Sequence, residues 1–339
     1  MNKLKVFEIN SGIGCYSQAL ENLGFEYEVV GISETNMYAL ESYYALHGKH
    51  KNYGDINYLK ADRIPNFDLL TYSFDLSELK NFKNDFGVLY KSLEVIKSKK
   101  PRILISESPK RILDKNNVVN FRLWKRALKD LGYKNLTHEF NALDFGIPQN
   151  RQRVYLISIR KDSGFPLDIF DISPITERPY SDLEDFIEET TDEIFEKYKI
   201  TDNKLKNYVE YDINISHEQI NVCGTVKNPK SKIGQRDQVY YKRGYIGALM
   251  ESDYRDPKKI CVSDSTCKDS VKIRKLTRKE YWLLMGFSNE QFEKVDRIGH
   301  SNSQMYSLAG RGAVIQALEY ILKLTLFEYK RKLKNQQKK

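Results

Sequence analysis

Short apolar runs alternate with amphipathic stretches over the first 160 residues of the chain. The apolar runs are rich in Val, Ile, Leu and Phe and are bounded by Gly, Pro or Asp, which is typical of strands buried on both faces. They lie at residues 5–9, 28–32, 68–72, 101–106 and 154–159. Stretches with helical character lie between them, for example at residues 16–23 and 88–99. This alternation predicts an α/β domain with a mostly parallel sheet.

The pattern changes between residues 165 and 270. Polar and basic stretches alternate there with short Tyr-rich segments, and no helical period persists beyond the acidic stretch 182–198. Helices are predicted again at 273–287 and, strongly apolar, at 313–327. The predicted organisation is therefore an α/β domain formed by residues 1–164 and 271–325, a smaller domain inserted at 165–270, and a basic tail at 326–339.

Composition narrows the class of protein. The hydrophobic share is 40% with 23 Tyr and 16 Phe, as in globular proteins. No apolar run approaches the roughly 20 residues of a membrane helix, and the chain opens on a strand-like run and not on a signal peptide. The four cysteines are not in CxxC pairs, so we expect no disulfide framework and no metal site. A cytoplasmic protein without membrane partners is predicted.

The net charge of +9 permits binding to a polyanion. Residues 323–339 hold seven Lys or Arg against one acid, Glu328. Such a tail either improves solubility or contacts phosphates, and the sequence leaves both interpretations open.

Several short motifs follow one another along the chain. A Gly-rich turn follows the first strand, an acidic residue follows the second, and an Arg-x-Arg pair precedes the strand at 154–159. The full set lies at residues 5–14, 31–36, 54–56, 106–108, 149–153, 273–287 and 304–314. A single Gly turn is weak evidence, but the ordered set is specific. It resembles the motifs of the cytosine-C5 DNA methyltransferase family of bacterial and phage restriction–modification systems.

The resemblance implies a Rossmann-like class I S-adenosylmethionine-dependent methyltransferase fold with a smaller inserted target-recognition domain. It also implies a cofactor pocket. The turn at Gly12 and Gly14 would bring backbone amides near the methionine part of the cofactor. Glu34 would bind the ribose hydroxyls, and Asp55 with Ile56 would face the adenine.

The resemblance places three further residues beside the target base. Glu107 matches the glutamate that holds the flipped cytosine, and Arg151 and Arg153 match the Gln-x-Arg-x-Arg motif. They either contact the base or a nearby phosphate, or they form a structural salt bridge across strand ends. We favour the second interpretation because the nucleophile is absent.

The nucleophile motif is interrupted. Residues 68–74 resemble its front and residues 75–77 its back, but the Pro-Cys-Gln expected between Phe74 and Asp75 is missing. In the family that cysteine thiolate attacks carbon 6 of cytosine, and a serine hydroxyl is a far poorer nucleophile. Cys15 and the three cysteines of the insert are expected to be small buried residues. The chain alone is therefore predicted to be inactive, with no intact catalytic residue.

Other positions depart from the family as well. The segment after Asp75 is short and has no Gly before Gly87, so it offers little freedom to a closing lid. Asn10 and Thr35 replace aromatic residues that pack on the adenine, and Arg311 replaces an asparagine near the cofactor. We therefore predict that S-adenosylmethionine binds weakly or not at all.

The insert combines Lys and Arg with Tyr, which is the composition of a surface that reads a DNA groove. Its candidate DNA-binding residues are Lys227, Lys230, Lys232, Arg236, Lys242 and Arg243. Double-stranded DNA is the expected ligand, and association with the nucleoid would follow.

Three functional hypotheses fit these observations. The first is a DNA-binding pseudo-methyltransferase, the non-catalytic subunit of a two-chain DNA (cytosine-5-)-methyltransferase in a restriction–modification or DNA-protection system. The second is an active enzyme whose nucleophile is supplied in trans or is unusual. The third is a DNA-binding regulator without a methylating partner. A methyl-transfer assay on the isolated chain separates the second from the others.

Overall fold

The computed structural model describes residues 3–74, 76–81, 87–163, 181–211, 216, 219–227, 234–263 and 271–336. The chain divides into two compact units. Unit 1 comprises Met1–Phe140, Gln152–Thr176 and Ile315–Lys339, and unit 2 comprises Asn141–Arg151 and Glu177–Val314.

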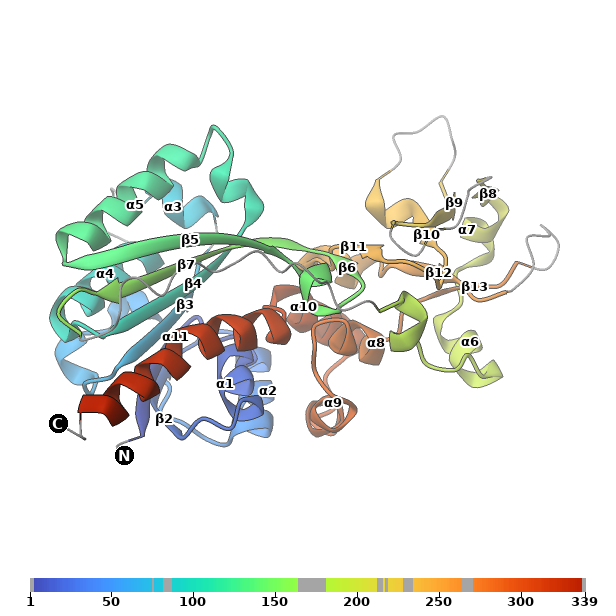
Figure 1. Ribbon diagram of the computed structural model, residues 1–339. Helices are drawn as coiled ribbons and strands as arrows, with labels where there is room; N and C mark the ends of the chain where they lie inside the picture. Colours follow the sequence, from blue (N-terminus) through green and yellow to red (C-terminus); the bar gives the residue numbers. More distant parts are fainter. Residues whose placement is uncertain are drawn as a thin grey trace. The chain divides into compact units, whose positions relative to one another are not determined.

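Unit 1 contains a six-stranded sheet in the order β2-β1-β3-β4-β7-β5 (Figure 1). The first four strands run parallel, and β7 is antiparallel to β4. The strands are β1 (Leu4–Ile9), β2 (Tyr27–Ser33), β3 (Leu69–Ser73), β4 (Ile103–Pro109), β5 (Tyr133–Asn141) and β7 (Gln152–Arg160). The apolar runs predicted to be strands all form strands of this sheet. The α/β class with a mostly parallel sheet is therefore confirmed.

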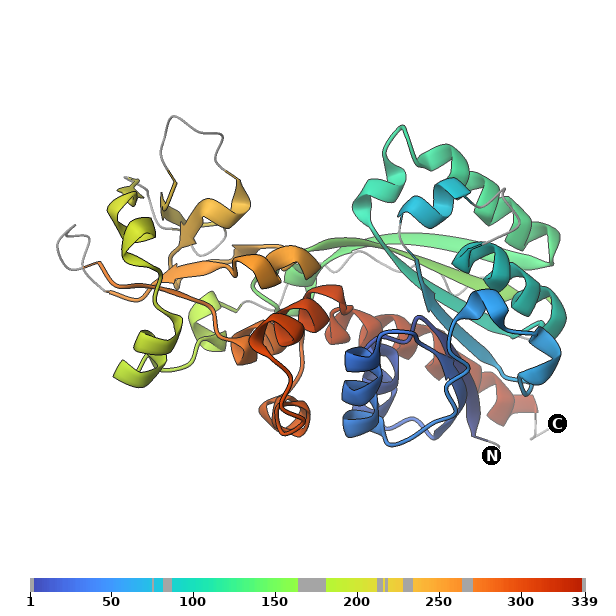
Figure 2. The ribbon, with the colours of Figure 1, turned by 180° about the vertical axis from the view of Figure 1, so that it is seen from behind.

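Helices cover both faces of the sheet in unit 1, as two opposite views show (Figures 1 and 2). Helices α3, α4 and α5 lie on one face, and α1, α2 and α11 on the other. Their bounds are α1 (Cys15–Asn22), α2 (Met37–His47), α3 (Leu76–Asn81), α4 (Val88–Lys99), α5 (Val118–Asp130) and α11 (Ile315–Gln336), with single 3₁₀ turns η1 (Ile56–Tyr58), η2 (Ala61–Arg63) and η3 (Lys110–Leu113). No helix among the described residues is long and apolar enough to cross a membrane.

The core of unit 1 explains why α5 lies where it does. Phe121, Trp124 and Leu128 recur at helical spacing and are at most 1% exposed. The Trp124 indole N–H donates to the hydroxyl of Tyr72 on β3 at 3.2 Å. This apolar stripe holds one face of α5 against the sheet and turns the opposite face outward.

Unit 2 is built on a five-stranded sheet in the order β13-β12-β10-β9-β8, with a separate pair β11-β6. Its strands are β6 (Gln149–Asn150), β8 (Val209–Glu210), β9 (Val222–Thr225), β10 (Gln238–Tyr240), β11 (Ile246–Gly247), β12 (Lys259–Cys261) and β13 (Ile273–Lys275). Its helices are α6 (Asp192–Tyr198), α7 (Asp202–Lys206), α8 (Arg278–Leu283), α9 (Asn289–Asp296) and α10 (Asn302–Arg311), with 3₁₀ turns η4 (Ala142–Phe145), η5 (Leu183–Phe186), η6 (Gln235–Asp237) and η7 (Glu251–Arg255).

The division into two units differs from the predicted domain boundaries at residues 271–314 and 141–151. The sequence pattern places residues 271–314 in the α/β domain, but they belong to unit 2 because β13 pairs with β12 and α10 packs on η7. The predicted helix 273–287 is a strand followed by a short helix. Residues 141–151 also belong to unit 2. The basic tail begins inside α11, whose backbone continues to Gln336.

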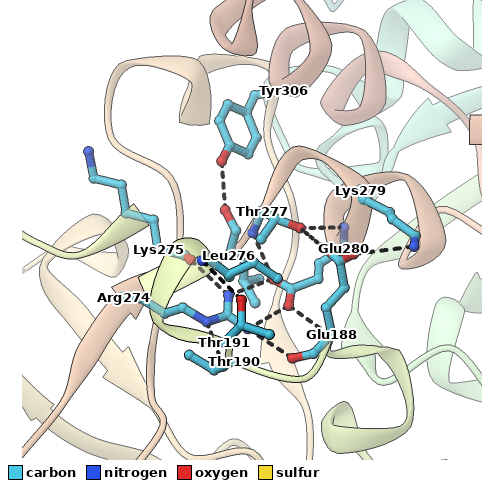
Figure 3. A network of polar contacts seen from close by, with 11 residues as sticks. Glu188, Thr190, Thr191, Arg274, Lys275, Leu276, Thr277, Lys279, Glu280 and Tyr306 are labelled. Atoms are coloured by element: carbon cyan, nitrogen blue, oxygen red, sulfur yellow. Dashed lines mark hydrogen bonds and ion pairs between the residues drawn. The ribbon is translucent and has the colours of Figure 1, made fainter. Parts of the chain in front are cut away.

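A buried ion pair organises the entry into α8 (Figure 3). The side chains of Arg274 and Glu280 are both 0% exposed and are joined by two hydrogen bonds, of 2.6 and 2.9 Å. The Glu280 carboxylate also accepts the backbone N–H of Thr277 at 2.6 Å and that of Glu188 at 3.0 Å. Thr277 in turn caps the helix through its hydroxyl. The motif 273–287 therefore has a structural role inside unit 2.

Candidate functional site

The Gly-rich turn joins β1 to α1 through three residues with positive φ. Asn10 has φ 52°, Gly12 58° and Gly14 80°. A Cβ at Gly14 would lie 2.5 Å from the ring of His47, so packing alone demands glycine there. The amide of Asn10 donates to the carbonyl of Ser73 on β3 at 3.0 Å and braces the turn against the neighbouring strand.

Glu34 follows β2, and its carboxylate accepts hydrogen bonds from backbone N–H groups of three other residues. One carboxylate oxygen accepts the N–H of Gly12 at 2.8 Å. The other accepts the N–H groups of Thr35 at 2.9 Å and Asn36 at 2.7 Å. Three of the roughly four lone-pair sites of this carboxylate are therefore used to tie the Gly turn to the start of α2.

Asp55 is also engaged locally. Its Oδ1 accepts the backbone N–H of Asn57 at 2.8 Å and the Asn57 side-chain amide at 2.9 Å, which caps the turn η1. Ile56 is 2% exposed and belongs to the hydrophobic core of unit 1. Both carboxylates predicted for the cofactor thus already have partners in the chain.

Strand β3 and helix α3 lie close together in the sequence at the nucleophile position. Strand β3 ends at Ser73 and helix α3 begins at Leu76, so only two residues separate them. Phe74 is 6% exposed and stacks on Tyr72 with ring centroids 6.1 Å apart. The chain therefore turns from strand to helix at the place where a catalytic loop would leave the sheet.

Helix α3 is fixed to the core. Leu79 is 0% exposed and packs in the main hydrophobic cluster of unit 1. The carboxylate of Glu78 accepts the N–H of Val88, the first residue of α4, at 2.8 Å. Within the segment expected to be too short for a lid, Glu78 and Leu79 are thus held by contacts in unit 1.

Glu107 and Arg153 form an ion pair across β4 and β7. Their Oε1 and Nε atoms are 2.9 Å apart, and their side chains are 10% and 16% exposed.

Tyr16, on α1, is not among the residues predicted from the sequence. Its hydroxyl is buried without a hydrogen-bond partner in the described part of the chain. Burial, with the Glu107 carboxylate as a smaller cause, raises the pKa of Tyr16 well above 10. In the sequence, only the position of Tyr16 shortly after the Gly turn could have pointed to this residue.

Arg151 does not join Glu107 and Arg153, although the sequence groups the two arginines. It belongs to unit 2 and is 3% exposed. Its guanidinium donates to the backbone carbonyls of Leu249, Gly310 and Gly312. Arg151 is therefore a structural arginine that joins three stretches of unit 2.

Gln149 supports the same region and was missed as a separate residue. It is fully buried, its amide nitrogen donates to the carbonyl of Leu284 at 2.9 Å, and its oxygen accepts the N–H of Leu249 at 2.8 Å. The Gln-x-Arg-x-Arg motif thus divides into two buried side chains of unit 2 and one ion-paired residue of unit 1.

Comparison with known proteins identifies the family. The family model for the C-5 cytosine-specific DNA methylase matches residues 4–325. The chain belongs to this family. It is 25% identical to the orphan methyltransferase M.SPBetaI of Bacillus phage SPbeta, covering 97% of this chain and 99% of that protein. It is 28% identical to the type II methyltransferase M2.ScrFI of Lactococcus lactis subsp. cremoris, covering 94% and 98%.

Solved structures agree on the fold. The S. pombe Dnmt2 methyltransferase superposes with a TM-score of 0.72 at 19% identity, covering 96% of this chain and 98% of that one. The Entamoeba histolytica methyltransferase EhMeth has a TM-score of 0.72 at 16% identity, covering 97% and 99%. The predicted class I methyltransferase fold is confirmed.

Only some of the residues expected to hold S-adenosylmethionine are suited to that role in this chain. The Gly turn, Glu34 and Asp55 follow strands and turns of unit 1 in the order expected for a cofactor pocket. The two carboxylates, however, are bound to their own chain. Asn10 and Thr35 are exposed polar residues where adenine would need a stacking face. Arg311, in unit 2, is ion-paired with Glu251 at 2.8 Å.

Four of the six candidate DNA-binding residues lie among the described residues of unit 2. Lys227 and Arg236 line a hollow of about 500 Å³. Lys242 and Arg243 follow β10, with Arg243 exposed. Lys230 and Lys232 lie outside the described residues.

A buried lysine lines the same hollow and was not predicted. Lys258 is 1% exposed and makes no ion pair with any described residue. Burial lowers its pKa. The hollow therefore combines three cations with the acids Asp237 and Asp253.

Proposed function

We propose that this C-5 methylase family member is a DNA-binding pseudo-methyltransferase, the non-catalytic subunit of a two-chain DNA (cytosine-5-)-methyltransferase. The observation that carries the proposal is the direct passage from β3 to α3 across two residues, neither of them a cysteine. Attack on carbon 6 of cytosine needs a strong nucleophile held close to the ring. In this chain that position is taken by a strand-to-helix turn.

The three cysteines that the structure describes offer no substitute. Cys15, Cys223 and Cys261 are buried and form no disulfide bond among the described residues. Cys223 and Cys261 belong to the hydrophobic cluster of unit 2. A hydrogen bond with Cys223 lowers the pKa of Cys261 to about 6, but Cys261 is only 5% exposed. A cytosine base therefore cannot reach the sulfur of Cys261, because attack on the ring requires an accessible thiolate.

Weak binding of S-adenosylmethionine is expected from the contacts of Glu34 and from the residues at positions 10 and 35. S-adenosylmethionine would have to compete with the backbone N–H groups that already hold Glu34. The lost aromatic contacts at Asn10 and Thr35 forfeit about 1–3 kcal/mol each, as for other stacking contacts.

DNA binding is the retained activity in this proposal. Arg236 in the hollow of unit 2 and the exposed Arg243 supply cations for phosphates and base edges. Fold and charge persist while the chemistry is absent, which suits a subunit that places DNA for an active cytosine methyltransferase chain. A protein held on DNA in this way would reside at the nucleoid.

Transfer of tritiated methyl groups tests the proposal. The purified chain alone should transfer none to duplex DNA, and addition of a cytosine methyltransferase chain that co-purifies with it should give activity that depends on both chains. Transfer by the isolated chain would favour an unusual nucleophile. DNA binding without any effect on a methyltransferase would favour a regulator.

A further inference from the structure

A row of cations covers the outward face of α5, on unit 1. Arg122, Lys125, Arg126 and Lys129 follow one another at intervals of three, one and three residues, which places all four on one side of a helix. The apolar stripe of Phe121, Trp124 and Leu128 fixes the opposite side in the core. The orientation of the row is therefore set by the packing of the helix.

The row borders a hollow of about 700 Å³. Lys134 on β5 and Lys161 after β7 contribute further cations to its lining, and Asp130 is the single acid there. Asp162, which follows Lys161 in the sequence, is ion-paired with Arg160. The hollow is thus lined by six cations against one carboxylate.

Contacts inside unit 1 hold the hollow together. The amide of Asn135 donates to the carbonyl of Lys125 at 2.6 Å, and its oxygen accepts the hydroxyl of Ser158 at 2.7 Å. The N–H of Lys161 donates to the carbonyl of Gly132 at 3.0 Å. Helix, edge strand and the end of β7 are therefore joined by their own hydrogen bonds.

The charges of the row are not neutralised. Arg122, Arg126 and Lys129 are exposed and have no carboxylate within ion-pairing distance in the described residues. Like charges at three- and four-residue spacing destabilise a helix. Burial, with the charge of Arg122 as a smaller cause, lowers the pKa of Lys125. An arrangement that costs stability points to a ligand that carries negative charge.

We infer that this face, Arg122, Lys125, Arg126, Lys129, Lys134 and Lys161, binds the phosphate backbone of duplex DNA at a second site, separate from the hollow of unit 2. Seven residues of helix span about 10 Å, which matches about three phosphate steps of one strand at 3.4 Å each.

The lining favours duplex DNA over other polyanions. Its one aromatic residue, Tyr133, is 1% exposed and its hydroxyl donates to the carbonyl of Pro101. Single-stranded nucleic acids are bound by stacking on aromatic side chains, and protein interfaces have an apolar centre. The lining offers neither, and its contacts are those of a backbone-binding surface without sequence preference.

The test is the salt dependence of DNA binding by the full chain. Arg122→Gln/Arg126→Gln/Lys129→Gln removes three charges and keeps good helix formers. Lys3→Gln/Lys49→Gln/Lys97→Gln is the matched control, because it removes three exposed charges scattered over unit 1. Anisotropy of a labelled duplex of mixed sequence is followed from about 50 to 200 mM salt.

The α5 variant should bind at least about tenfold more weakly, with a slope of log K against log salt that is shallower by about 2–3. The control should lose less than half of that effect. Equal behaviour of the two variants would overturn the inference, as would tighter binding of polyglutamate or of a single strand than of the duplex. The conservative Arg122→Lys/Arg126→Lys variant should keep the affinity, and its loss would also overturn the inference.

A fourth variant separates this site from the function proposed above. Arg236→Gln/Arg243→Gln removes two charges from unit 2 and leaves α5 unchanged. If the Arg236→Gln/Arg243→Gln variant changes sequence preference while the α5 variant matches its control, the second site fails and the proposed recognition of DNA by unit 2 stands. If the α5 variant alone weakens binding, the second site stands and DNA reading by unit 2 fails.

Discussion

Insertion of Pro-Cys-Gln between Phe74 and Asp75 should not create a methyltransferase. The insertion supplies the missing thiol, but the chain on its far side is committed to α3. For the new residues to form a loop at the end of β3, either α3 moves or the loop bulges away from the sheet. Neither arrangement places the thiolate within the near-attack distance that the reaction needs.

The cost of moving α3 can be worked from its contacts. Exposing the fully buried Leu79 costs about 1.5–3 kcal/mol. Losing the hydrogen bond from the Val88 N–H to the Glu78 carboxylate costs about 1.5–3 kcal/mol more. The sum, about 3–6 kcal/mol, is a large part of the roughly 5–15 kcal/mol that typically stabilises a folded domain.

Two assays follow the insertion variant. Tritiated methyl transfer to duplex DNA should stay at background, and urea denaturation should give a free energy of unfolding lower by about 3–6 kcal/mol if α3 moves. The same insertion with Ala in place of Cys is the control for the thiol. Methyl transfer above that control would refute the reasoning, because it would mean that the remainder of the site is intact.

Four further predictions concern the cofactor, the buried charges and the tail. Calorimetry should detect weak or no binding of S-adenosylmethionine, and a low-micromolar affinity would contradict the partial fit. Glu280→Gln leaves Arg274 buried without its counter-charge and should lower the free energy of unfolding by about 3–5 kcal/mol, whereas Glu290→Gln on an exposed pair should change it by less than about 0.5 kcal/mol. Lys258→Met should raise the thermal midpoint at neutral pH, because the folded state lowers the pKa of this lysine. The gain should shrink as the pH rises towards 10.5. No gain at neutral pH would mean that the ammonium group is well solvated. Truncation after Phe327 should flatten the salt dependence of DNA binding without altering sequence preference, and an unchanged slope would assign the tail to solubility alone.

The sheet of unit 1 was predictable because its central strands are buried on both faces and read as short apolar runs. Strand β5 was not predicted. Its sequence, Tyr133–Asn141, is mostly polar and half-buried, as expected at an edge of the sheet. The limit near residue 271 was also misplaced, because β13 has only three residues and its pairing with β12 cannot be read from local periodicity.

The candidate site was predictable by position but not by role. The sequence places Arg151 and Arg153 together, yet one donates to backbone carbonyls and the other pairs with Glu107. It offers no indication that His47 packs against Gly14, or that Glu34 is held by the Gly turn. Such partners are distant in sequence, so only the folded chain reveals which side chains are already engaged.

The last helix has a consequence for how the chain is made. Unit 1 is completed by α11, which packs on α1, and Glu319 accepts a hydrogen bond from Asn22 at 2.6 Å across 297 residues of sequence. On a ribosome the N-terminal segment emerges first and waits for the C-terminal helix, while nearly all of unit 2 is synthesised in between. The apolar face of α1 stays uncovered for that period, a state in which nascent chains aggregate or recruit chaperones. A chain that stopped before α11 would carry almost every motif of the family and still lack the cover that its first helix needs.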